Sequence, residues 1–198
     1  MIKHKTRWSL AVAAAIAAAG LAGTAPASAA NDSHCVVSVG GGRPTTCFGT
    51  FAAALEFASG GELVTGPKNA ANALRDPAFH AQVDAANDAS DLKVRSGAQA
   101  LTVWTVISIE RDNVNYGVPG LIYSGSGGNC STPTGNIDYQ EPSMPAGWDN
   151  RIESFYSYAN CWVQHFENGS YGGASSALTG SRSTLGVMNN QTSSIRWT

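Results

Sequence analysis

The residues best suited to bind a ligand lie close to the C-terminus. Residues 189–194 read Asn-Asn-Gln-Thr-Ser-Ser, and Ile195 and Trp197 follow them in the alternation expected of a β-strand. Amide, hydroxyl and carbonyl oxygens are the hard ligands that calcium prefers in proteins. The loop is therefore a candidate calcium site. The competing interpretation is that Asn189 and Ser193 only satisfy backbone groups of a turn.

A second pattern precedes this loop and indicates a hairpin. It begins at Phe166, reaches a second aromatic residue at Tyr171 and ends on Gly173. Aromatic residues on either side of a glycine-containing turn predict two paired strands. In this order, the hairpin and the loop resemble the Greek-key repeat of the βγ-crystallins. The hairpin of that family has the pattern aromatic-x4-aromatic-x-Gly, and its calcium loop has the pattern N/D-N/D-x-x-S/T-S.

A partial first copy of the same unit lies earlier in the chain. Large apolar residues alternate over residues 101–109 as they do in a strand, and the next segment has the length of the crystallin hairpin. This segment keeps Tyr116, but Arg111 stands in place of the first aromatic residue and Val118 in place of the final glycine. Residues 149–154 then parallel the later loop, so the chain resembles two consecutive repeats.

The resemblance implies both a fold and a ligand. Two Greek-key motifs are expected to form one all-β, βγ-crystallin-like sandwich over residues 101–198. In the family, each loop gives a main-chain oxygen from its second residue and a hydroxyl from its fifth, and the opposite hairpin completes the calcium shell.

Carried over to this chain, two ions would each have a set of ligands. The first set is Asn190 and Ser193, beside Asn189 and with the hairpin near Glu110; the second is Asn150 and Glu153, with the hairpin near Glu167. Because Glu153 replaces a hydroxyl residue of the family, we expect the first site to be the stronger one. Sites with so few charged ligands are expected to have a Kd on the order of 10⁻⁴–10⁻³ M.

Residues 1–30 have the organisation of a secretory signal peptide, so we expect a secreted, extracellular protein. A basic start precedes an alanine-rich apolar run, and Ala27-Ser28-Ala29 supplies the small residues of a cleavage site. All 14 acidic residues follow this segment, which holds some of the 12 basic ones, so the exported chain is net acidic. Its acidity, and the lack of a second long apolar run, argue against nucleic acid and membranes as partners.

The cysteines predict disulfide bonds. All four lie in the exported part: Cys35, Cys47, Cys130 and Cys161. An even number in an oxidising compartment favours two disulfides, for which three pairings exist. We expect Cys35–Cys47 and Cys130–Cys161, because each pair then lies within one structural unit. Zinc is the alternative, but the chain has no C-x2-4-C pair, and its histidines do not cluster with the cysteines.

Residues 31–100 are expected to form a small, disulfide-stapled α/β N-terminal segment and linker. Two short β runs around a glycine turn predict the stapled hairpin, and Thr50 is placed to cap a helix that ends at Ala58. Large apolar residues then become few. We expect only weak helical turns, near 69–75 and 77–86, in a linker-like stretch.

The sequence predicts a protein that is not an enzyme. It has no GxSxG, HExxH, CxxC or P-loop pattern. Its histidines are far apart, and His165, beside an aromatic residue in a predicted strand, is expected to be exposed.

Two functions remain open at this point. One is a calcium-binding extracellular module in which the ion contributes stability. The other is an inhibitor of secreted proteases, because the resemblance extends to bacterial metalloprotease inhibitors built on this sandwich. Such an inhibitor would present a loop that is already ordered, which lowers the entropic cost of binding. Residues 124–147 are the candidate loop. A toxin-like or cell-wall-binding role is a third option.

Overall fold

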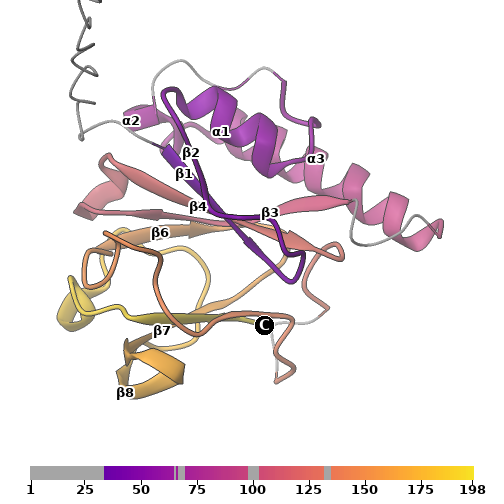
Figure 1. The fold of residues 1–198 in the computed structure, drawn as a ribbon. Helices are drawn as coiled ribbons and strands as arrows, with labels where there is room; N and C mark the ends of the chain where they lie inside the picture. Colours follow the sequence, from indigo (N-terminus) through magenta and orange to yellow (C-terminus); the bar gives the residue numbers. More distant parts are fainter. Residues whose placement is uncertain (1–33, 65, 67–69, 98–102, 132–134) are drawn as a thin grey trace, which may run out of the picture.

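The computed structural model describes residues 34–64, 66, 70–97, 103–131 and 135–198. They form a helical layer and two β-sheets (Figure 1). The first sheet has the strand order β2 (Thr46–Phe48), β1 (His34–Val39), β4 (Gly120–Ser126), β3 (Trp104–Arg111) and β6 (Ser154–Ser157). The second has the order β5 (Tyr139–Glu141), β9 (Ser194–Trp197), β7 (Val163–Asn168) and β8 (Gly172–Ser175). The predicted signal peptide and the predicted boundary at residue 100 lie outside the described residues.

The two sheets enclose an apolar core. Its fully buried members include Tyr123 and Phe155 from the first sheet and Ile195 and Trp197 from the second. Side chains of a strand point alternately to its two faces, so every second residue reaches this core. An irregularity of β3 between Val106 and Ser108 changes that alternation, because an extra residue in a strand shifts which side chains point inward.

The first repeat contributes a strand to the sheet of the second, and the second repeat pairs with the sheet of the first through an isolated β-bridge. β5 belongs to the first repeat but pairs with β9 of the second, with Tyr139 opposite Trp197. In return, Arg182 of the second repeat bridges to Phe155 in β6, and their backbones exchange two hydrogen bonds of 2.9 Å. A Greek-key connection produces this kind of exchange. The predicted all-β sandwich of two Greek-key motifs is therefore confirmed.

The hairpins of the two repeats have the same backbone conformation. The first turns through η2 (Val114–Tyr116), where Asn115 and Tyr116 have φ of 54° and 63°. The second turns through η3 (Gly169–Tyr171), where Ser170 and Tyr171 have φ of 54° and 65°. Two successive left-handed residues in both turns show that the sequence departures in the first copy do not change its fold.

Arg111 has the place in the first repeat that Phe166 has in the second. Arg111 lies opposite Ser154, as Phe166 lies opposite Ser194. The Arg111 side chain is fully buried, and its guanidinium carbon lies 5.0 Å from the ring centre of Phe51. Burial lowers the pKa of Arg111 to about 10. An aromatic ring of the N-terminal segment thus covers the position where the first repeat lacks its own.

The N-terminal segment contributes the edge of the first sheet and its helical cover. β1 runs parallel to β4, with Cys35 opposite Leu121, and β2 returns antiparallel to β1. α1 (Phe51–Ala58) begins at the predicted cap, where the Thr50 hydroxyl accepts a hydrogen bond of 3.2 Å from the Ala53 N–H. α1 and α3 lie over the face of the first sheet that points away from the second (Figure 1).

The expectation of only weak helical turns in this segment is wrong for its second half. α2 (Ala70–Ala73) is a single turn, but α3 (Pro77–Arg95) is 19 residues long. Asp76 caps α3 by accepting a hydrogen bond of 2.9 Å from the Ala78 N–H, and proline is tolerated in a first turn. The buried side chains after Phe79 and Val83 are small, so this helix can pack close to the sheet. For the same reason the sequence shows no apolar periodicity that would predict the helix.

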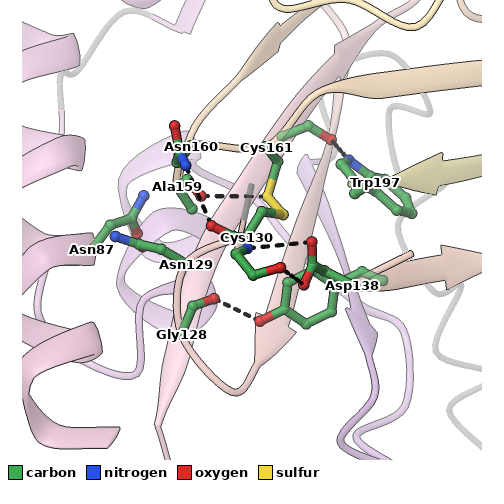
Figure 2. The surroundings of a disulfide bond; sticks show 12 residues. Asn87, Gly128, Asn129, Cys130, Asp138, Ala159, Asn160, Cys161 and Trp197 are labelled. Atoms are coloured by element: carbon green, nitrogen blue, oxygen red, sulfur yellow. Dashed lines mark hydrogen bonds between the residues drawn. A yellow bond between two sulfur atoms is a disulfide. The ribbon is translucent and has the colours of Figure 1, made fainter. Parts of the chain in front are cut away.

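Both predicted disulfides are present. Cys35–Cys47 joins residues that lie opposite each other in β1 and β2. Cys130–Cys161 joins the segment after β4 to the start of β7, and the Cys130 N–H donates a hydrogen bond of 2.8 Å to the Ala159 carbonyl (Figure 2). The second bond therefore ties the long connection of the first repeat to the second repeat.

Much of the candidate inhibitory loop, residues 124–147, instead belongs to the sandwich. β4 continues to Ser126, β5 begins at Tyr139, and Met144 is buried in the core. Only residues 127–138 lie between the two strands, and 132–134 are outside the described residues. The base of this shorter loop is closed by Asp138, whose carboxylate accepts hydrogen bonds of 3.3 and 3.0 Å from the N–H and hydroxyl of Ser131 (Figure 2).

Candidate calcium site

The two Asx-rich loops hold each other by a reciprocal pair of backbone hydrogen bonds. The Asn150 N–H donates to the Thr192 carbonyl at 3.0 Å, and the Asn190 N–H donates to the Ile152 carbonyl at 2.9 Å. Asn150 and Asn190 both have a left-handed backbone with φ of 57°, a conformation that asparagine tolerates better than most residues. The second residue of each loop, Asn150 or Asn190, therefore lies beside the opposite loop.

This arrangement brings predicted ligands of the two loops together. The sequence predicts that the main-chain oxygen of Asn190 and the hydroxyl of Ser193 bind one ion, and the Asn190 side chain contacts Glu153 of the other loop. Its amide nitrogen lies 2.5 Å from Glu153 Oε1, and Glu153 Oε2 accepts a hydrogen bond of 3.0 Å from the Val114 N–H. Glu153 thus bridges the loop of the second repeat and the hairpin of the first. The contact between Asn190 and Glu153 follows from the loop exchange, which a repeat considered alone does not reveal.

Ser193 lies in the other half of this arrangement. Its N–H donates to the Phe166 carbonyl at 2.8 Å, and its carbonyl accepts from the Met144 N–H at 2.9 Å. Asn150 is its neighbour across the loops, through the hydrogen bond to Thr192. The Ser193 hydroxyl has no hydrogen-bond partner among the described residues. The Ser193 hydroxyl, on the side of the loops near Asn150, is therefore an oxygen that the described residues leave unused.

Asn189 and Glu167 have local structural partners. The Asn189 side-chain oxygen accepts hydrogen bonds from the Leu185 N–H at 2.9 Å and from the Thr184 hydroxyl at 3.2 Å. Glu167 Oε2 accepts a hydrogen bond of 3.0 Å from the Ala174 N–H across its own hairpin. Asn189 therefore fits the alternative interpretation, in which it satisfies the turn.

Glu110 lies inside the sandwich and not at the loops. Its two carboxylate oxygens contact the Ser108 hydroxyl at 2.6 Å and His165 Nε2 at 3.1 Å. The Trp197 ring N–H donates to the same hydroxyl at 3.0 Å. All four side chains are fully buried, so Glu110 is left out of the ligand set.

The expectation that His165 is exposed is therefore wrong. His165 is completely buried, and its ring centre lies 4.7 Å from that of Phe155. The signal was present in the strand alternation, because His165 shares the parity of Val163, which is a core residue.

Two charged residues beside the loops, Arg151 and Asp112, were not predicted to contact each other. Arg151 donates to Asp112 Oδ2 from its Nε atom at 3.0 Å and to the Gly147 carbonyl at 2.7 Å. This ion pair joins the first hairpin to the first loop. Nothing in the spacing of residues 112 and 151 indicated the contact, which depends on the pairing of β3 with β6.

Within the described ranges, no group of three or more His, Cys, Asp or Glu side chains is arranged to hold a metal ion. Any calcium site here would use mainly amide, hydroxyl and carbonyl oxygens, which that ion accepts. The same ranges contain no helix that is long and apolar enough to cross a membrane.

No known family model matches the chain, and a comparison with curated proteins found no match. Among solved structures, a βγ-crystallin from an archaeon is 20% identical, with a TM-score of 0.34 over 47% of this chain and 98% of its own. The N-terminal domain of protein S is 15% identical, with a TM-score of 0.34 over 46% and 94%. A βγ-crystallin domain from Flavobacterium johnsoniae is 17% identical, with a TM-score of 0.33 over 46% and 93%. The chain has a βγ-crystallin-like fold, visible in its own strand exchange and paired hairpins.

Proposed function

We propose that this protein is a secreted, non-enzymatic crystallin-like module that binds calcium weakly where its two Asx-rich loops meet. The observation that carries the proposal is the reciprocal bonding of the loops through Asn150 and Asn190. Each candidate ligand set then contains residues of both repeats, so a bound ion would hold the repeats together. Two disulfides suit the oxidising environment outside a cell.

The contact between the two loops has two halves, one with Ser193 and Asn150 and one with Glu153 and Asn190, and they differ in how well they suit an ion. Ser193 offers a hydroxyl that has no hydrogen-bond partner among the described residues. Asn150 beside it offers an amide oxygen and a main-chain oxygen. Glu153, in the equivalent place of the other half, already accepts hydrogen bonds from Val114 and Asn190. Its carboxylate thus makes the contacts between loop and hairpin that an ion would otherwise make. We therefore expect one principal ion, in the half that contains Ser193.

A thermal melt of the secreted protein with calcium and with a chelator tests this function. For a site with a Kd of about 0.1 mM, calcium at about 1 mM adds roughly 1.4 kcal/mol to the free energy of unfolding. That gain raises the Tm by several degrees in a domain of this size. The variant Ser193→Ala should lose most of the rise and keep the calcium-free Tm. Ser183→Ala, at an exposed serine, is the matched control. Equal melts with calcium and with chelator would refute the function.

A second candidate function, inhibition of secreted proteases, is favoured by the support of the loop over residues 127–138. The Cys130–Cys161 disulfide fixes its first part (Figure 2). Asp91 of α3 accepts a hydrogen bond of 3.3 Å from the Asn129 N–H, and the Tyr139 hydroxyl donates to the Gly128 carbonyl at 2.6 Å. Both ends of this loop are held in place, which lowers the entropy that they would lose on entering a protease cleft.

An inhibition assay separates this candidate from the first. The secreted protein would be titrated against thermolysin and against a secreted serine protease, with a one-to-one endpoint expected for one of them. Replacing residues 132–137 by glycine and serine should abolish inhibition while Ser131, Asp138 and the disulfide keep the fold. Lack of inhibition of either protease at micromolar protein would remove the support for this function and would leave the calcium proposal unaffected.

A further inference from the structure

The N-terminal segment contains a surface pocket that the crystallin-like sandwich does not explain. It lies between α1 and the β1–β2 hairpin, has a volume of about 390 Å³, and is lined mainly by Arg43, Phe48, Ala53, Glu56 and Phe57. The Phe48 and Phe57 ring centres lie 5.2 Å apart at an angle of 47°, which gives the pocket an aromatic wall. The lining of this pocket contains no residue of the Asx-rich loops.

Arg43 is the cation of this pocket, and its own contacts fix its position. The guanidinium carbon lies 4.0 Å from the ring centre of Trp104 and 4.4 Å from that of Phe57. Nη1 donates a hydrogen bond of 3.0 Å to the Phe57 carbonyl. Two rings and one carbonyl thus hold the planar group in one orientation before any ligand arrives.

Most of the hydrogen-bonding capacity of Arg43 is unused by the described residues. No carboxylate of the described residues forms an ion pair with it, and only one of its five N–H donors has a described partner. Partial burial also lowers its pKa, because the charged form loses solvent. A fixed guanidinium next to aromatic rings is suited to a planar anion that carries an apolar group.

We propose that this pocket binds an apolar carboxylate. Arg43 holds the carboxylate by hydrogen bonds from its unused donors, and the apolar group lies against Phe48 and Phe57. Glu56 is an exposed residue of the same lining, and its negative charge disfavours ligands that carry more than one carboxylate. A free carboxylic acid and the C-terminal residue of a peptide share this chemistry.

The test uses two pairs of probes and the backbone amide signals of the isotope-labelled secreted protein. The first pair is N-acetyl-phenylalanine and its uncharged amide; the second is a tetrapeptide ending in phenylalanine, with a free or an amidated C-terminus. We expect both free carboxylates to shift the amide signals of Phe57, Gly60 and Gly61, and both amides to bind at least tenfold more weakly. Tighter binding of the free tetrapeptide than of the single residue assigns the site to peptide C-termini, and equal binding assigns it to small carboxylates.

Variants separate recognition from folding. Arg43→Gln should weaken binding of N-acetyl-phenylalanine at least tenfold. Because this change also removes the contact with Trp104, Ala53→Leu provides a second variant that narrows the pocket and keeps Arg43. Arg95→Gln, at the exposed end of α3, is the control that should bind like wild type. The proposal is overturned if acid and amide bind equally, or if a folded Ala53→Leu variant and the Arg43→Gln variant both bind like wild type.

Discussion

Ser154 and Ser194 make the same two hydrogen bonds at equivalent points of the two repeats. Ser154 Oγ accepts from the Tyr116 N–H at 3.1 Å and donates to the Asn113 carbonyl at 2.6 Å. Ser194 Oγ does the same in the second hairpin, at 3.0 and 2.7 Å. Each serine is the last residue of an Asx-rich loop, so it connects that loop to the hairpin of its own repeat.

We expect Ser154→Ala and Ser194→Ala each to lower the free energy of unfolding by about 1–3 kcal/mol, because each leaves a hairpin N–H and carbonyl without the hydroxyl. Chemical denaturation of the two variants measures the loss. The exposed Ser183→Ala should stay within about 0.5 kcal/mol of wild type. If Ser154→Ala and Ser194→Ala both stay within about 0.5 kcal/mol of wild type, the hydroxyls do not hold the hairpins.

Asn87 of α3 attaches the helical layer to the sheet. Its side chain exchanges two hydrogen bonds with the backbone of Val106 in β3, at 2.9 and 3.0 Å. Asn87→Ala should lower the free energy of unfolding by about 2–4 kcal/mol, since it leaves two buried backbone groups unpaired. The neighbouring exposed Asp88→Ala serves as the control in the same denaturation experiment. Similar midpoints for the two variants would contradict the role of Asn87.

The buried pair of Glu110 and His165 predicts a non-additive effect. Glu110→Leu alone should lower the free energy of unfolding by about 3–5 kcal/mol, because it leaves a buried polar ring without its partner. The double variant Glu110→Leu, His165→Leu should lose less than Glu110→Leu, because it removes both polar groups together. A double-mutant cycle by urea denaturation gives the coupling free energy. Additive losses would mean that the two side chains act independently.

The sequence predicted the parts of this fold that are encoded locally. The second hairpin follows from Phe166, Tyr171 and Gly173, and the two disulfide pairs follow from placing each pair within one structural unit. α3 was missed because its buried face consists largely of Ala, Asn and Ser, which give no apolar periodicity. Close packing of α3 on β3 and the hydrogen bonds of Asn87 attach this helix to the sheet without large apolar side chains.

The sequence named residues of the candidate site but did not show which of them lie next to one another. Asn150, Glu153, Asn190 and Ser193 all lie where the two loops meet. Which of them share a position depends on the strand exchange between repeats, and that is a property of the tertiary fold. Glu110 was misplaced for a related reason, since the residue next to a hairpin can point into the core or to the surface.

Glu153→Ser should open a second calcium site. The substitution restores the hydroxyl of the family pattern and frees the Val114 N–H and the Asn190 amide from the carboxylate. We expect the number of bound ions to rise from one to two, while stability without calcium falls by about 1–2 kcal/mol through the lost hydrogen bonds. Equilibrium dialysis with radioactive calcium counts the ions. An unchanged stoichiometry of one would mean that Glu153 does not occupy a site.

Isothermal titration calorimetry of calcium into the wild-type protein and into Ser193→Ala tests the central claim most directly. The account predicts one principal site in the wild type, with a Kd on the order of 10⁻⁴–10⁻³ M. It predicts at least a tenfold weaker site in Ser193→Ala, with a calcium-free melt that matches wild type. Absence of binding heat in the wild type, or identical titrations for the two proteins, would contradict it and leave the loop as a turn.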